Sequence, residues 1–170
     1  MTARHVAPGN KQQGFSLLEA LIAILIFSLS LLGLIGIQGS AIGLSIDAKH
    51  RSDASYLANQ ILAQMWVDRA NLNTYAHYAT ENAADACAPG GAASTNPKVV
   101  GTTGGSWTEQ VAETLPGATA NRQQIRVVDT TATINGNEYK RRQVTIVVCW
   151  KRPQETTWRN HVTTSEMDAS

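Results

Sequence analysis

Charge is absent from a long stretch of this 170-residue chain: the 27 residues from Ala20 to Ile46 contain no Asp, Glu, Lys or Arg. Proline is also absent between Pro8 and Pro89, so no missing backbone donor interrupts a helix there. Elsewhere Lys and Arg are scattered and the net charge is only +1. This balance lacks the concentrated positive charge expected of a dedicated nucleic-acid-binding protein.

The motifs of the common enzyme classes are missing too. The sequence has no phosphate-binding loop and no dinucleotide fingerprint, and Ser106 lacks the flanking pattern of a nucleophile elbow. The histidines show no metal-ligand spacing; they are His5, His50, His77 and His161. We therefore expect no enzymatic activity, no metal and no cofactor.

The uncharged stretch predicts a membrane-spanning helix. Residues 20–37 are apolar nearly all round, and a helix needs about 20 such residues to cross a hydrocarbon core of roughly 30 Å. We place the anchor at residues 15–46. Arg4 and Lys11 precede it, whereas the four charges that follow it cancel. The positive-inside rule then leaves residues 1–14 in the cytoplasm and exports the chain beyond the anchor.

The segment before the anchor has the form of a processing site. An ordinary secretory signal has a shorter apolar stretch, and the mature protein keeps none of it. Here the polar leader Met1–Gly14 ends in a glycine directly before Phe15, and Glu19 follows. This string resembles the processing motif of type IV prepilins. The resemblance implies that prepilin peptidase cuts between Gly14 and Phe15, methylates the new amine of Phe15 and leaves the helix attached.

Two interpretations of Glu19 remain open. In the first, Ser16-Leu-Leu-Glu19 is a capping box, and the carboxylate also favours the positive end of the helix. In the second, the resemblance to pilins implies that Glu19 pairs with the freed amine of Phe15, on its own or a neighbouring subunit. That pairing would guide docking in a filament.

Glycines recur along the anchor at spacings of three or four; they are Gly33, Gly36, Gly39 and Gly43. They can allow close approach of another helix, or they can be lipid-exposed filler. Related pilins partly unwind this helix around a proline and a glycine. Without the proline, only the glycine cluster could serve that purpose here.

Beyond the anchor the helical period continues, and we predict one helix over 15–70. Its apolar face comprises Ala54, Leu57, Ala58, Ile61, Leu62 and Met65. Met65 and Trp66 are interpreted as packing against a sheet. Residues 71–120 are rich in Gly, Ala, Thr and Asn and are predicted to be mostly loop, with a short helix at 107–115.

The last part of the chain, residues 121–170, changes to the period of strands. A hairpin is predicted from 124–134 and 139–150 around Asn135-Gly136, and a third strand from 156–164. Alternation places four apolar side chains on one face: Val144, Ile146, Val148 and Trp150. The predicted fold is α+β: a long N-terminal helix, transmembrane in its first half, packed on a small antiparallel sheet. The pilin resemblance implies the same architecture.

Cys87 and Cys149 are the only cysteines and lack redox spacing. A structural disulfide is favoured in an oxidising compartment, with two buried free thiols as the alternative. Basic and aromatic residues could form a nucleic-acid face or, as we favour, a solvated strand edge; the basic ones are Lys140, Arg141, Arg142, Lys151, Arg152 and Arg159.

The segments 31–38 and 56–62 resemble the PilV group of minor pilins. This resemblance implies a minor pilin, built into a pilus or its tip, that helps start assembly. Its implied partners are other minor and major pilins, the inner-membrane assembly platform and a tip adhesin. It would cross the inner membrane once, with its C-terminal domain in the periplasm, before entering a surface filament. The alternatives are a minor pseudopilin of type II secretion and a DNA-binding or adhesive pilin.

Overall fold

The computed structural model describes residues 17–101, 104–134, 137–153 and 155–168. They fall into two units, Met1–Ser45 and Ile46–Ser170, which are treated separately. The processing residues Gly14 and Phe15 lie outside the described part.

Helix α1 (Leu17–Val67) is continuous over 51 residues. It begins and ends close to the predicted bounds, and no proline interrupts it. In the first unit its large apolar side chains are exposed, for example Leu17 at 84% and Ile37 at 70%. The hydroxyls of Ser28 and Ser30 donate to the carbonyls of Ile24 and Ile26 at 2.7 and 2.8 Å. These bonds satisfy the two hydroxyls within the helix, as a lipid environment requires.

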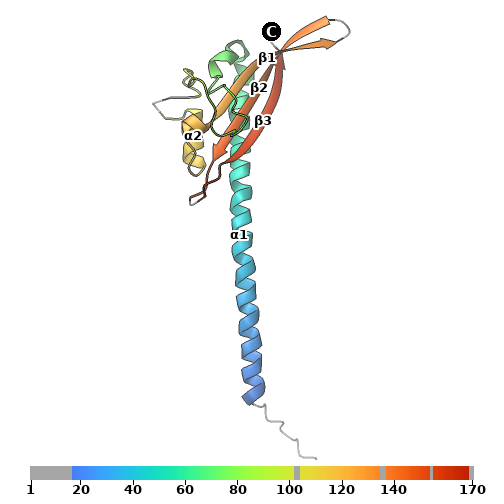
Figure 1. The fold of residues 1–170 in the computed structure, drawn as a ribbon, viewed down its shortest axis with the longest axis vertical. Helices are drawn as coiled ribbons and strands as arrows, with labels where there is room; N and C mark the ends of the chain where they lie inside the picture. Colours follow the sequence, from blue (N-terminus) through green and yellow to red (C-terminus); the bar gives the residue numbers. More distant parts are fainter. Residues whose placement is uncertain (1–16, 102–103, 135–136, 154, 169–170) are drawn as a thin grey trace, which may run out of the picture. The chain divides into compact units, whose positions relative to one another are not determined.

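The second unit contains the end of α1 and a three-stranded antiparallel sheet (Figure 1). The strands are β1 (Gln124–Ile134), β2 (Asn137–Trp150) and β3 (Arg159–Asp168), in the order β1-β2-β3. Three short helices complete the unit: η1 (Arg69–Tyr75), α2 (Trp107–Thr114) and η2 (Ala120–Arg122). A long helix packed on a small antiparallel sheet is the predicted α+β fold, consistent with a pilin-like architecture.

The core lies between the end of α1 and one face of the sheet. Five residues of α1 are buried: Ala54, Leu57, Ala58, Ile61 and Met65. Alternate residues of β2 oppose them, and all four apolar side chains predicted for this face are buried: Val144, Ile146, Val148 and Trp150. Helix α2 adds Trp107, whose Nε1 donates to the Leu57 carbonyl at 3.0 Å. The helical and strand periods therefore predicted both faces of the core correctly.

Two details of the prediction are wrong. Trp66 is not in the core: it is 39% exposed, with the Arg69 guanidinium 5.1 Å from its ring centre. The third strand spans Arg159–Asp168, not 156–164, because its pairing with β2 runs from Trp150↔Arg159 to Arg141↔Asp168. Residues 151–158 instead form a connection whose ends are fixed by other contacts.

One of these contacts requires a glycine. Gly117 has a φ of +64°, and a Cβ there would lie 2.7 Å from the Lys151 carbonyl oxygen. The Lys151 amide also donates to the Pro116 carbonyl at 3.0 Å. The start of the β2–β3 connection is therefore held against the segment after α2.

Candidate functional site

Glu19 is the acidic residue in the first turn of α1, and it is exposed. Its position suits the positive end of the helix dipole. The other members of the two interpretations, Ser16 for the capping box and Phe15 for the pairing, lie outside the described residues. Both interpretations of Glu19 therefore stay predictions.

The candidate functional surface of the first unit is the apolar helix itself. Its most hydrophobic window is entirely unburied within the single chain, and its length and composition suffice to cross a membrane. An exposed apolar surface of this extent needs lipid or other helices to cover it. The anchor glycines are also open, since an added Cβ at Gly33, Gly36, Gly39 or Gly43 would meet nothing within 4 Å. The helix continues through them without unwinding.

At the start of the second unit, Asp47 holds two arginines from the far end of the sequence. Its Oδ2 accepts hydrogen bonds from Arg159 Nη1 at 2.7 Å and Arg152 Nη2 at 2.9 Å. Arg159 also donates Nε and Nη2 to both carboxylate oxygens of Glu155. These hydrogen bonds, to Glu155 first and then to Asp47, raise the pKa of Arg159. The network fastens the β2–β3 connection to the helix.

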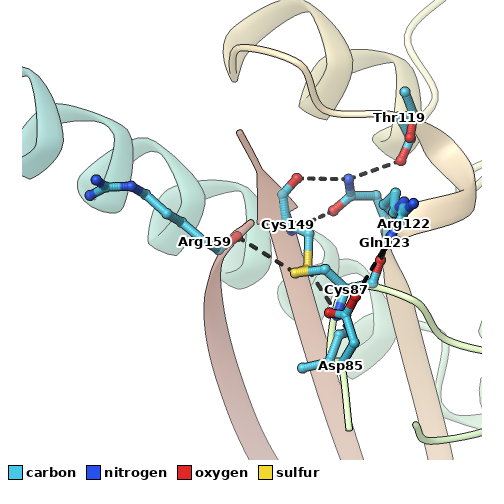
Figure 2. Close-up of a disulfide and its surroundings, with 8 residues drawn as sticks. Asp85, Cys87, Thr119, Arg122, Gln123, Cys149 and Arg159 are labelled. Atoms are coloured by element: carbon cyan, nitrogen blue, oxygen red, sulfur yellow. Dashed lines mark hydrogen bonds and ion pairs between the residues drawn. A yellow bond between two sulfur atoms is a disulfide. The ribbon is translucent and has the colours of Figure 1, made fainter. Parts of the chain in front are cut away.

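The structure joins Cys87 and Cys149 in a disulfide, both residues at most 1% exposed (Figure 2). Gln123 stands beside it: its Oε1 accepts from the Cys149 amide at 2.8 Å and its Nε2 donates to the Cys149 carbonyl at 3.0 Å. Arg122 donates to the Cys87 carbonyl at 2.8 Å. The bond ties the loop before α2 to the end of the central strand β2.

His77 is a buried residue whose ring makes hydrogen bonds with the loop before α2 and with η2. It is fully buried, and its Nδ1 accepts from the Ser94 amide at 3.0 Å. Its Nε2 must therefore carry the proton and donate to the Ala120 carbonyl at 2.8 Å. Burial lowers the pKa of His77, so the imidazole is held neutral. Its backbone forms a bridge with Ile125 at the start of β1.

A polar cluster follows the end of α1. Asp68 accepts hydrogen bonds from Asn71 at 2.7 Å, Tyr75 at 3.0 Å and Lys98 at 3.3 Å. These bonds, with Asn71 first, lower the pKa of Asp68. The hydrogen bond to Tyr75 and the contact with Asp68 raise the pKa of Lys98. The cluster links η1 to the loop before α2.

The basic residues considered for nucleic acid do not share one free face. Four of the six are paired with carboxylates: Arg141 with Glu166, Arg142 with Asp129, and Arg152 and Arg159 with Asp47 and Glu155. The other two, Lys140 and Lys151, flank a stretch of β2 that is roughly 30 Å long at the strand rise. The strand-edge interpretation is nevertheless wrong for Lys140, Arg141 and Arg142, because they lie on β2, the central strand of the sheet.

Comparison with known proteins gives a match near the N-terminus. A family model described as the prokaryotic N-terminal methylation motif matches residues 9–35, which include Gly14, Phe15 and Glu19. No match was found among curated proteins or among solved structures. The motif is a type IV prepilin-like leader and supports a pilin-like or pseudopilin-like protein. Such proteins are structural, and with the apolar helix the motif indicates membrane anchoring.

Sequence reasoning found the residues that the motif contains and the cysteine pair, but missed the second unit's polar contacts. Asp47 and Arg159 lie 112 positions apart, and nothing in their local patterns relates them. His77 was considered only as a metal ligand. Its position in a loop rich in small residues gave no sign that it would be buried.

Proposed function

We propose that this chain is a minor pilin of a type IV pilus, built into the filament or its tip and helping to start pilus assembly. The observation that carries the proposal is that one helix serves two purposes. The first part of α1 exposes its apolar side chains, and its last part is the helix on which the sheet packs. Cleavage that removed the anchor would leave the exported unit without lipid or filament contacts, whereas cleavage after Gly14 retains them.

The chemistry of the anchor favours other pilins as partners. When a subunit leaves the bilayer, its exposed apolar side chains must be covered again, and helices of the same kind can do so. The exported part of α1 continues this surface with Tyr56 at 69%, Trp66 at 39% and Val67 at 90% exposure. Tyr56 and Val67 are eleven positions apart, about three helical turns, and so lie on the same side of the helix, with Trp66 about 80° around from Tyr56. The remaining proposed partners are prepilin peptidase, the assembly platform and a tip adhesin.

The first test concerns processing and topology. The N-terminal sequence of the mature protein should begin at Phe15 with a methylated amine, and a reporter fused at the C-terminus should be active only in the periplasm. A mature chain beginning near residue 40 would contradict the pilin interpretation, since an ordinary signal peptidase leaves such a product.

The second test separates the two pilin-like roles, because the pseudopilins of type II secretion share the same leader. Deleting the gene should reduce the number of surface pili while leaving secreted enzymes at wild-type levels, and a plasmid copy should restore the pili. Normal piliation with lost secretion would favour the pseudopilin. Normal piliation and secretion, with reduced attachment or DNA uptake, would favour an adhesive or DNA-binding pilin.

A further inference from the structure

The β2–β3 connection lies beside the residue that directly follows the anchor. Asp47 is the first charged residue after the uncharged stretch, and it binds Arg152 and Arg159 at the two ends of this connection. Because Asp47 follows Ile46 in the chain, residues 151–159 are tethered close to the end of the anchor in every orientation of the exported unit. We call residues 47–53 and 151–159 together the basal surface.

The basal surface has an excess of basic over acidic residues. It contains five Lys and Arg against three Asp and Glu, a net charge of +2. The rest of the chain beyond residue 46 has seven Lys and Arg against nine Asp and Glu, a net charge of −2. The basal surface therefore has a net positive charge, whereas the remainder of the unit has a net negative charge.

Trp158 gives this surface an aromatic residue among cations. The Lys151 ammonium lies 5.3 Å and the Arg122 guanidinium 4.7 Å from its ring centre. Within the described residues, Lys151 and Arg51 make no ion pair with a carboxylate. Trp, Lys and Arg are the residues that favour the interface between bilayer and water. Two cations of the basal surface are thus uncompensated by carboxylates, and Trp158, which is partly buried against Cys87, Val147 and Cys149, lies beside one of them.

We propose that the basal surface binds the anionic phospholipid headgroups of the bilayer that α1 crosses, and so holds the exported unit on the membrane before assembly. This rests on the membrane anchorage in the proposed function. Lipid phosphate is the occupant because the anchor places the surface within reach of the headgroup layer, whereas free phosphate gains no such proximity. Asp47 is paired with two arginines, so its carboxylate would not face the negatively charged lipid headgroups as an isolated charge.

The test uses the full chain reconstituted into vesicles of phosphatidylglycerol or of phosphatidylcholine, each brominated near the top of its acyl chains. Bromine quenches nearby tryptophan, and the difference between wild type and Trp158→Phe isolates Trp158. We expect this quenching in phosphatidylglycerol and much less in phosphatidylcholine. A basic residue near an anionic surface changes a binding equilibrium about fivefold. Lys151→Glu should therefore reduce the docked-to-free ratio by at least about fivefold, as should high salt.

Lys140→Glu is the matched control: it makes the same charge change at the other end of β2 and should leave the quenching unchanged. Equal losses for Lys151→Glu and Lys140→Glu would overturn the proposal, because only total charge would matter. So would equal quenching in the two lipids, or none. Alkaline extraction is measured first on the same vesicles. A chain that is extracted overturns the anchorage itself, and a chain that is retained without Trp158 quenching overturns the lipid contact alone.

Discussion

The disulfide gives the sharpest stability prediction, for the double variant Cys87→Ala/Cys149→Ala. The bond closes a loop with a sequence separation of 62. In the chain-entropy model, a loop of this length removes enough freedom from the unfolded chain to stabilise the fold by about 4 kcal/mol. Both residues are at most 1% exposed, so the variant also leaves space that neighbouring side chains fill only in part. The expected loss is therefore about 4 kcal/mol.

The structure also indicates which part of the second unit should lose protection first in the Cys87→Ala/Cys149→Ala variant. Gln123 still bonds the amide and carbonyl of Cys149 without the disulfide, so β2 stays connected to η2. The loop around Cys87 keeps weaker ties, among them the Arg122 bond to its carbonyl, the Arg126–Glu81 ion pair and the Thr80–Gly90 bridge. Hydrogen exchange should therefore quicken in residues 80–92 more than in β2.

The assay is thermal unfolding of the detergent-solubilised full chain, followed by tryptophan fluorescence. For a unit of this size, a loss of about 4 kcal/mol lowers the melting temperature by roughly 10–20 °C. Wild type that is unfolded, reduced and refolded in reductant should melt near the double variant, because it has lost the same constraint. A decrease of less than about 1 kcal/mol, or uniform exchange across loop and strand, would refute the reasoning.

Three further predictions follow from named contacts. Glu19→Ala should be processed and inserted normally yet fail to enter sheared filaments; normal incorporation would leave only the capping interpretation. Asp47→Asn should destabilise the second unit by about 1–2 kcal/mol, because it weakens two charged hydrogen bonds. Asp53→Asn is the control: its partner Lys49 is 68% exposed, so the loss should be under about 0.5 kcal/mol. Equal urea midpoints for the two variants would contradict this. Burial lowers the pKa of His77 in the fold, so its stabilisation is full above a pH of about 6.5 and decreases below it, where the unfolded imidazole binds a proton. His77→Asn should flatten the stability curve below about pH 6.5, and parallel curves would exclude this role.

The sequence predicted those parts of the fold that depend on local period. The uncharged stretch indicated the anchor, and the spacing of Ala54, Ile61 and Met65 indicated the buried face of the helix. Alternation along β2 likewise identified its buried side chains. In each case one face of the element is buried and must be apolar. The apolar residues therefore recur along the sequence with the period of a helix or a strand.

The features that the sequence did not predict depend on contacts between segments that are distant in the chain. Trp66 follows Met65 in the chain, but a helix turns about 100° between neighbours, and the core covers only the side that Met65 occupies. The start of β3 could not be read from Thr156 and Thr157, although threonine favours strands. Arg159 lies at that boundary through its register with Trp150 and its bond to Asp47, and neither contact has a local signal.

Helix α1 runs from the uncharged stretch to the core of the second unit, and the distance between the two can be calculated from the helical rise. Ile46 ends the uncharged stretch and Ala54 is the first buried residue of the core; eight helical steps between them span about 12 Å. A headgroup layer is roughly 5–8 Å thick on each side of the hydrocarbon core. The four charges between these residues therefore have room to lie in that layer and just above it, without entering either the lipid core or the protein core. Under the lipid-contact proposal, Asp47 and the two arginines that bind it would lie at that depth, which is why the test reads out Trp158 in the same β2–β3 connection.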